Sequence, residues 1–172
     1  MAYTHYSEIS ADVAERASKV RIVVFDVDGT LTDGRLWYAE DGRETKVFHV
    51  HDGQGIKRLQ KAGVKVAIIS GRDSAAVTRR MQDLGIEHVF QGDEDKLPIL
   101  EKLLKRLDLG PEQVACVGDD LPDLPLLQHA GLGIAVHDAQ AVLKAAAHHV
   151  TAAPGGLGAA REVCDLILEA RA

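Results

Sequence analysis

Residues 22–30 read Ile-Val-Val-Phe-Asp-Val-Asp-Gly-Thr, a short apolar run that ends in two carboxylates and a glycine. An uninterrupted apolar run of this length predicts a strand that is buried on both faces, as in the middle of a parallel sheet. The strands expected on this basis are 22–26, 64–70, 88–90, 114–118 and 132–136. Helical patterns lie between most of them, at about 8–19, 53–62, 73–84, 95–107, 122–129, 138–147 and 157–170.

This alternation predicts an α/β fold, a Rossmann-like parallel sheet flanked by helices. The chain has 172 residues, of which 46% are hydrophobic and 27% charged, so we expect one globular domain over residues 1–172. Its net charge of −6 offers no basic surface for nucleic acid, and its apolar runs are too short to cross a membrane. The first residues carry no secretion signal, which predicts a cytoplasmic protein.

One segment interrupts the alternation of strands and helices. Two β-like stretches, LWY at 36–38 and KVFHV at 46–50, flank Asp41-Gly42, and this pair is a strong turn signal. We therefore expect a β-hairpin over about 34–50 that projects from the sheet. Isolated hairpins are marginally stable in water, so this arm either folds back on its own domain or packs against the same hairpin of other subunits.

Acidic residues follow two of the expected strands. Asp26 ends the first strand, Asp28 comes shortly after it, and Asp119 comes after the fourth. Because the carboxyl ends of parallel strands share one edge of the sheet, we expect these side chains to converge. Three carboxylates repel one another unless a cation lies among them, and an oxygen-only ligand set suits Mg²⁺ better than zinc.

These residue types fit phosphoryl transfer through an aspartyl-phosphate. Asp26 would attack phosphorus, while Asp28 would protonate the leaving oxygen and then deprotonate a water molecule. Ser70 and Lys96 would hold the remaining phosphate oxygens. Arg72 is the best-placed cation for the phosphate or for a second anionic group of the substrate, although an arginine that starts a helix is often simply exposed to solvent.

Four segments in this order carry a resemblance to a known superfamily. They are Asp-Val-Asp-Gly-Thr at 26–30, Ser70 within Ile-Ile-Ser-Gly-Arg, Lys96, and Gly-Asp-Asp-Leu-Pro-Asp at 118–123. The set resembles the haloacid dehalogenase-like (HAD) superfamily of phosphohydrolases.

The resemblance implies a role for each acidic residue. Asp26 would be the nucleophile and Asp28 the general acid and base, with Mg²⁺ held by the Asp26 carboxylate, the Asp28 backbone carbonyl and Asp119. Asp120 and Asp123 would lie near the metal or orient the lysine of the third motif. Both also lie beside a proline at a helix start, where a capping role is an alternative.

The likeness extends over nearly the whole chain. Residues 50–56, 90–92 and 155–162, together with a hairpin in place of a cap domain, are similar to the 3-deoxy-D-manno-octulosonate 8-phosphate (KDO 8-phosphate) phosphatases of lipopolysaccharide precursor biosynthesis. This resemblance implies a phosphorylated sugar acid as substrate, with Gly71 and Arg72 in contact with it.

Two further properties are implied by this resemblance. One is a homotetramer joined through the hairpins. The other is a flexible, Gly-rich C-terminal tail over about 154–172 that can close a site as a lid. Truncation before Pro154 should then change turnover more than stability.

Other functions remain open at this point. The nearest is a phosphatase of a related nine-carbon sugar-acid phosphate. A signalling receiver domain also groups acids, a hydroxyl and a lysine, but the spacing of Asp26 and Asp28 and the added hairpin disfavour it. A non-catalytic oligomerisation module of the same fold has no use for so many clustered charges.

Overall fold

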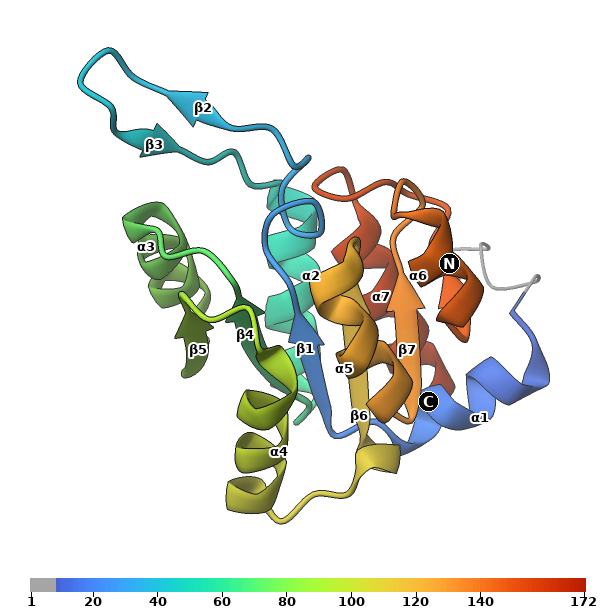
Figure 1. The fold of residues 1–172 in the computed structure, drawn as a ribbon. Coiled ribbons are helices and arrows are strands. Elements are labelled where there is room, and N and C mark those ends of the chain that lie inside the picture. Colours follow the sequence, from blue (N-terminus) through green and yellow to red (C-terminus); the bar gives the residue numbers. More distant parts are fainter. Residues whose placement is uncertain (1–8) are drawn as a thin grey trace.

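The computed structural model describes residues 9–172 and has a six-stranded parallel sheet at its centre (Figure 1). The strand order is β5-β4-β1-β6-β7-β8. The strands are β1 (Ile22–Phe25), β4 (Lys65–Ser70), β5 (His88–Gln91), β6 (Val114–Gly118), β7 (Leu132–Ala135) and β8 (His149–Val150). The expected α/β class is confirmed, and the expected strands agree to within one residue at each end. The short edge strand β8 was not expected, because two residues carry no periodic signal.

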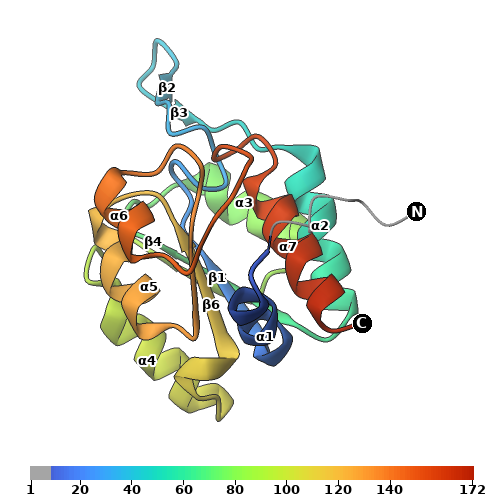
Figure 2. The same ribbon diagram turned by 90° about the vertical axis from the view of Figure 1, so that its right-hand side faces the viewer.

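Helices cover both faces of this sheet (Figure 2). One layer holds α1 (Ala11–Lys19), α2 (Val50–Lys61), α3 (Ala75–Leu84) and α7 (Ala159–Ala170). The other layer holds α4 (Lys96–Leu107), α5 (Leu124–His129) and α6 (Ala141–Ala146). Two 3₁₀ turns, η2 (Pro111–Gln113) and η3 (Leu121–Asp123), precede β6 and α5. Within residues 9–172, no helix has both the length and the apolar character needed to span a membrane.

The central strand explains why its sequence is apolar throughout. All four residues of β1 are buried, since β1 lies between β4 and β6 with a helix layer on each face. Its Phe25 is paired with Ile68 of β4 on one side and with Val117 of β6 on the other. The three strands therefore end side by side at one edge of the sheet. Asp26 follows the last residue of β1 at this edge.

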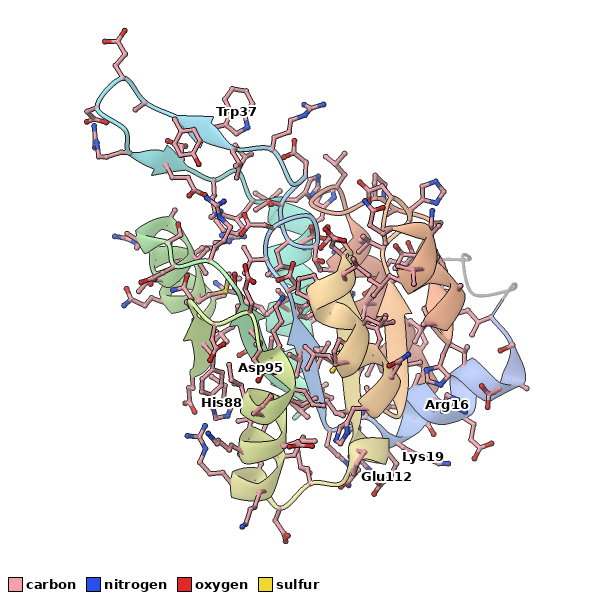
Figure 3. The ribbon with its side chains drawn as sticks, viewed as in Figure 1. Arg16, Lys19, Trp37, His88, Asp95 and Glu112 are labelled. Carbon is pink, nitrogen blue, oxygen red and sulfur yellow. The ribbon has the colours of Figure 1, made fainter. Side chains whose placement is uncertain are left out.

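The expected hairpin is present and projects beyond that edge (Figures 1 and 2). Strand β2 (Trp37–Tyr38) pairs in antiparallel register with β3 (Glu44–Thr45). The turn is closed by the Gly42 N–H, which donates to the Ala39 carbonyl at 2.9 Å, as the Asp-Gly signal predicted. Trp37 points away from the domain (Figure 3) and is 54% exposed.

The second half of the hairpin differs from the expectation. Its strand is β3 rather than 46–50, and Val50 already belongs to α2, three residues before the helix start expected from the sequence. The cause is a cap: the Nδ1 atom of His49 accepts a hydrogen bond from the His51 backbone N–H at 3.1 Å. A helix start is stabilised by such a bond, so the chain leaves the hairpin early.

The C-terminal segment confirms the expected helix but corrects the expectation of a flexible tail. Residues 159–170 form helix α7, and its apolar face is part of the core rather than of a flexible tail. Buried residues on this face are Ala159, Ala160, Val163, Cys164, Leu166 and Ile167. The helix expected at about 157–170 is thus present, but the glycines before it do not make the segment a flexible tail, because the apolar residues at helical spacing bury it in the core.

Helix α2 holds α7 in place. The Oδ1 atom of buried Asp52 accepts a hydrogen bond from the Arg161 backbone N–H at 2.9 Å, which satisfies one of the free donors at the start of α7. A Cβ on Gly55 would lie 3.2 Å from the Arg161 Cα, so the two helices approach where α2 has no side chain. Asp52 and Gly55 thus form a packing surface for α7, whereas Gly53 faces Arg80 and Leu84 of α3.

Candidate active site

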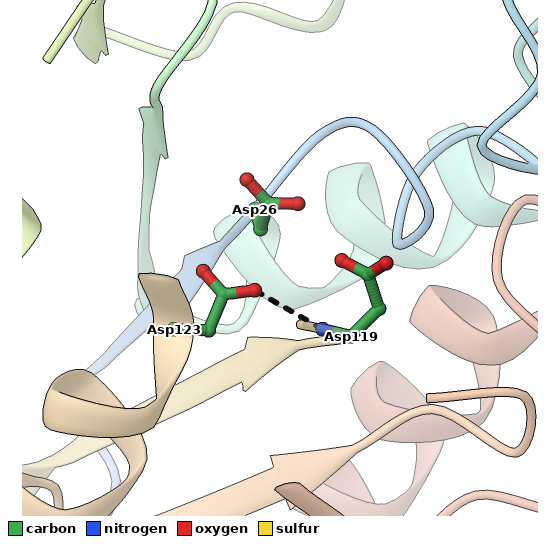
Figure 4. Close-up of side chains that lie close together, drawn as sticks. All are labelled: Asp26, Asp119 and Asp123. Carbon is green, nitrogen blue, oxygen red and sulfur yellow. Dashed lines mark hydrogen bonds between the residues drawn. The ribbon is translucent and has the colours of Figure 1, made fainter. Parts of the chain in front are cut away.

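Three carboxyl groups meet at the carboxyl edge of the sheet (Figure 4). Asp26 directly follows β1, Asp119 directly follows β6, and Asp123 ends the 3₁₀ turn η3. Carboxylate oxygens of these three residues lie within 4.8 Å of one another. The predicted convergence of Asp26 and Asp119 is confirmed, and Asp123 joins them.

Gly29 makes room for this cluster. Its φ of +91° is one that glycine adopts without strain, and it turns the chain back after Asp28. A Cβ added to Gly29 would lie 2.1 Å from Oδ2 of Asp119. The side chain of Asp119 therefore occupies the space that a larger residue in the first motif would fill.

Lys96 joins two of the acids. Its Nζ donates to Oδ1 of Asp26 at 2.7 Å and to Oδ1 of Asp123 at 2.7 Å, and the lysine is 4% exposed. Desolvation alone would lower the pKa of Lys96, but the charges of Asp26 and Asp123 raise it above its usual value. The amine is therefore a permanent cation beside Asp26.

Burial and mutual repulsion make the acid cluster hold protons unusually well. Desolvation, with repulsion from Asp123, raises the pKa of Asp26 to about 6. Desolvation, with repulsion from Asp26 and Asp123, raises the pKa of Asp119 to about 8. A divalent cation would offset this repulsion, and an all-carboxylate donor set is typical of Mg²⁺ sites. The residues therefore fit the expected metal.

Mg²⁺ affinity is expected to rise with pH across the range set by the pKa values of about 6 for Asp26 and about 8 for Asp119. Below these values protons occupy the carboxylates and compete with the cation, and above them they do not. Titration of Mg²⁺ with the melting temperature as readout, near either end of this range, measures the effect. Asp119→Asn should abolish the Mg²⁺-induced shift, and an affinity independent of pH would contradict this account.

Asp123 is held in a different way from the other two acids. Its Oδ2 accepts from the Asp119 backbone N–H at 3.1 Å, while its Oδ1 accepts from Lys96. Both oxygens are thus committed to protein donors, which suits a residue that positions Lys96. Oδ1 of Asp120 accepts from the Leu121 N–H at 2.7 Å, which is the capping alternative considered from the sequence.

The second motif lies at the end of β4, the strand that pairs with β1. Ser70 is the last residue of β4 and is buried, and its Oγ accepts from the Arg72 backbone N–H at 3.4 Å. A Cβ on the intervening Gly71 would lie 3.2 Å from Cγ of Glu94. The chain thus turns tightly between Ser70 and the exposed guanidinium of Arg72.

The expectation that Asp28 joins the carboxylate cluster is wrong: the cluster consists of Asp26, Asp119 and Asp123, and the Asp28 side chain belongs to a second charged group. Its Oδ1 accepts a hydrogen bond from Nζ of Lys46, which also pairs with Glu44, and its Oδ2 lies 3.8 Å from Nε of Arg72. The Arg72 guanidinium in turn donates to Glu44 at 2.7 Å. Two cations and two anions therefore alternate between the hairpin and the edge of the sheet.

Sequence reasoning missed Glu44. From the sequence, Lys46 is only a weaker candidate than Arg72 for an anionic group of the substrate, and a solvated charge is the favoured interpretation, but its side chain is 2% exposed. The available signal was their spacing: residues two apart on a strand point to the same face, here the face toward Asp28. That signal is weak without knowledge of where the hairpin lies.

Comparison with known proteins agrees with this geometry. The family model described as haloacid dehalogenase-like hydrolase matches residues 23–92 and 88–156. The 3-deoxy-D-manno-octulosonate 8-phosphate phosphatase KdsC of Yersinia pestis is 46% identical, over 98% of this chain and 90% of that protein. The chain belongs to the haloacid dehalogenase-like hydrolases, in the family of the KDO 8-phosphate phosphatases. The resemblance inferred from the four motifs is thereby confirmed.

Solved structures of this family have the same fold. A probable YrbI family phosphatase from Pseudomonas syringae pv. phaseolica is 57% identical, with a TM-score of 0.93 over 94% of this chain and 92% of that one. The KDO 8-phosphate phosphatase of Moraxella catarrhalis is 44% identical, with a TM-score of 0.92 over 93% of this chain and 92% of that one. That relative was crystallised with a magnesium ion, a phosphate ion and a KDO molecule.

Proposed function

We propose that this HAD-family hydrolase is a Mg²⁺-dependent phosphatase that hydrolyses KDO 8-phosphate to KDO and inorganic phosphate. The observation that carries the reaction is the position of Asp26, buried at the sheet edge between Lys96 and the carboxylate of Asp119. The substrate is supported by the near full-length similarity to KDO 8-phosphate phosphatases.

In the first step the Asp26 carboxylate attacks phosphorus. A bond forms between its oxygen and phosphorus while the bond from phosphorus to the sugar oxygen breaks, and Asp28 gives its proton to that oxygen. The ammonium group of Lys96 donates a hydrogen bond to the Asp26 carboxylate and offsets the negative charge that develops beside it during the reaction. The products are the sugar acid and an aspartyl-phosphate.

In the second step water releases the phosphate. Asp28, now a carboxylate, takes a proton from water, the water oxygen binds phosphorus, and the bond to Asp26 breaks. This restores the Asp26 carboxylate and the proton on Asp28, so the enzyme ends as it began.

The chain has residues that would hold the metal and the substrate. Mg²⁺ would be held by Asp26, the Asp28 backbone carbonyl and Asp119, and when bound it offsets the repulsion between carboxylate and phosphate. The Ser70 hydroxyl and the Gly71 backbone would contact the phosphate oxygens. Arg72, exposed beside them, would bind an anionic group of the sugar acid. Asp120 would position the loop after β6, and Asp123 would position Lys96.

A direct assay tests this function. KDO 8-phosphate and a nine-carbon sugar-acid 9-phosphate are compared with Mg²⁺ present and after chelation. We expect a kcat/KM at least about tenfold higher for KDO 8-phosphate, and no phosphate release after chelation. Preference for the nine-carbon ester would mean that the protein is instead a phosphatase of the nine-carbon sugar-acid phosphate. The absence of phosphate release from both would refute the proposal.

We also propose that the protein is located in the cytoplasm. Cell fractionation tests this location.

We also propose that four copies assemble through the hairpin. Trp37 and Tyr38 on β2 and Val47 after β3 are 54%, 61% and 61% exposed in the single chain, and apolar groups of this size are typically covered. Such an arrangement would join the exposed arm of one subunit to the open site of another.

Trp37→Ser is expected to shift the assembly from tetramers to smaller species. Loss of a central aromatic contact typically weakens an interface by about 2–4 kcal/mol, which is 30-fold or more in dissociation constant. Native mass spectrometry or light scattering over a concentration series measures it, with Glu40→Ser at the exposed hairpin tip as the matched control. A wild-type protein that stays monomeric, or an unchanged mass for Trp37→Ser, would contradict hairpin-mediated assembly.

A further inference from the structure

Lys46 is a buried cation on an arm that is otherwise exposed. Trp37, Tyr38 and Val47 of the hairpin face solvent, whereas the side chains of Lys46 and Glu44 are 2% and 17% exposed. Burying an ammonium group costs free energy unless anions surround it, and here Asp28 and Glu44 both contact Nζ. Stability of the hairpin alone does not explain this arrangement, because one of the two anions belongs to the catalytic motif after β1.

The two oxygens of Asp28 have different surroundings. Oδ1 accepts the hydrogen bond from Lys46. Oδ2 is buried and has no hydrogen-bond partner among the described residues, and the nearest cationic group, Nε of Arg72, is 3.8 Å away. A buried carboxylate oxygen without a partner is costly, and it is therefore the oxygen that is free to carry a proton toward a ligand.

We propose that Lys46 is a positioning residue, which fixes Oδ1 of Asp28 so that Oδ2 carries the proton given to the leaving oxygen of the substrate. The inference rests on the proposed phosphatase function and deepens it. In the step concerned, the proton passes from Oδ2 to the sugar oxygen as the bond between that oxygen and phosphorus breaks and the bond to Asp26 forms. Lys46 transfers no proton and touches no substrate atom.

Glu44 has the supporting part. It lies between Lys46 and Arg72 and pairs with both, so Asp28, Glu44, Lys46 and Arg72 together have no net charge while Asp28 is ionised, and one net positive charge when Oδ2 of Asp28 carries its proton. Removing Lys46 alone would leave two neighbouring carboxylates beside an incoming phosphate. A loss of rate in that variant has two explanations, charge repulsion and lost orientation of Asp28, and the experiment must separate them.

The test uses leaving groups of different quality. Phenyl phosphate has a poor leaving group that needs a proton, whereas 4-nitrophenyl phosphate has a good one that does not, and both lack the sugar acid. We measure kcat/KM, which reports the steps up to departure of the leaving group, for wild type and Lys46→Met. Because general acid catalysis contributes about 10²-fold or more, the loss for phenyl phosphate should exceed that for 4-nitrophenyl phosphate by at least about tenfold.

Two further variants complete the experiment. The double variant Lys46→Met with Glu44→Gln removes one cation and one anion, so it keeps the net charge of the wild-type cluster whether or not Asp28 is protonated, and it should retain the difference between the two esters. Arg43→Met removes a cation from the exposed end of the same hairpin and should change neither ester by more than about twofold. Recovery of phenyl phosphate hydrolysis in the double variant would assign the loss to charge and overturn the positioning role.

The inference and the proposed function fail in different ways. If wild type hydrolyses the aryl phosphates and Lys46→Met loses both equally, the positioning role is wrong and the phosphatase remains. If wild type hydrolyses neither the aryl phosphates nor KDO 8-phosphate, the proposed function is wrong and the role of Lys46 falls with it. Thermal melts of every variant confirm that the compared proteins are folded.

Discussion

Asp26→Asn is expected to reduce phosphate release by more than about 10³-fold while leaving the fold intact. The carboxamide cannot attack phosphorus, and it removes an anion from both Lys96 and the metal site. Phosphate release from KDO 8-phosphate with saturating Mg²⁺ measures the loss. Asp83→Asn, an exposed change of the same kind on α3, is the matched control. Turnover by Asp26→Asn near the wild-type rate would refute the assignment of the nucleophile.

The same variant should melt at an equal or higher temperature than wild type when no cation is present. Desolvation raises the pKa of Asp26 from 3.8 to about 6, so above that pH the folded protein bears the cost of a buried charge. Asparagine removes this cost. The advantage should disappear as the pH falls below the ordinary carboxyl pKa, where the group is protonated in both the folded and the unfolded state. A variant less stable than wild type at pH 8 would show that the carboxylate stabilises the fold.

Truncation before Pro154 is expected to abolish folding, and not merely to alter turnover as the sequence suggested. It removes helix α7, whose Val163, Leu166 and Ile167 are buried against the rest of the core. Burial of three such side chains contributes about 5–9 kcal/mol, which is comparable to the total stability of about 5–15 kcal/mol of a typical domain. Circular dichroism and thermal unfolding of the truncated chain measure the effect. A truncated protein with a cooperative transition near that of wild type would contradict the role of α7 in the core.

A point variant tests the same helix without removing it. Ile167→Ala should lower the free energy of unfolding by about 2–5 kcal/mol, because it leaves a cavity in the core. Glu169→Ala, on the exposed side of the same helix, should change it by less than about 0.5 kcal/mol. Urea denaturation measures both variants, and equal values for the two would place α7 outside the cooperative core.

The strands and the acidic edge of the sheet were predictable because each depends on residues that are adjacent in the sequence. A buried parallel strand needs an apolar run, so β1 and β6 could be located without knowledge of their partners. Asp26 and Asp119 follow those runs directly, and parallel strands end at the same edge. Their convergence therefore follows from the fold class alone.

Two parts of the prediction failed where the deciding contact is distant in the sequence. The glycines before α7 indicated a flexible tail, but Asp52 binds the start of that helix from 109 residues away. Lys46 is a residue of a type that is usually exposed on the surface, yet the fold of the hairpin places it against Asp28. In both cases burial depends on which element lies opposite, and local pattern does not contain that information.

The amino-acid order alone determined the α/β class, the positions of five strands of the central sheet and the order of the acidic motifs, since these follow from periodicity and from what a strand end can carry. The tertiary structure decided which charges are buried together, the pairing of Lys46 with Asp28, and the place of α7 in the core. The physical reason is that desolvation and ion pairing act through space, so their effect on a residue is set by neighbours that the chain brings to it only by folding.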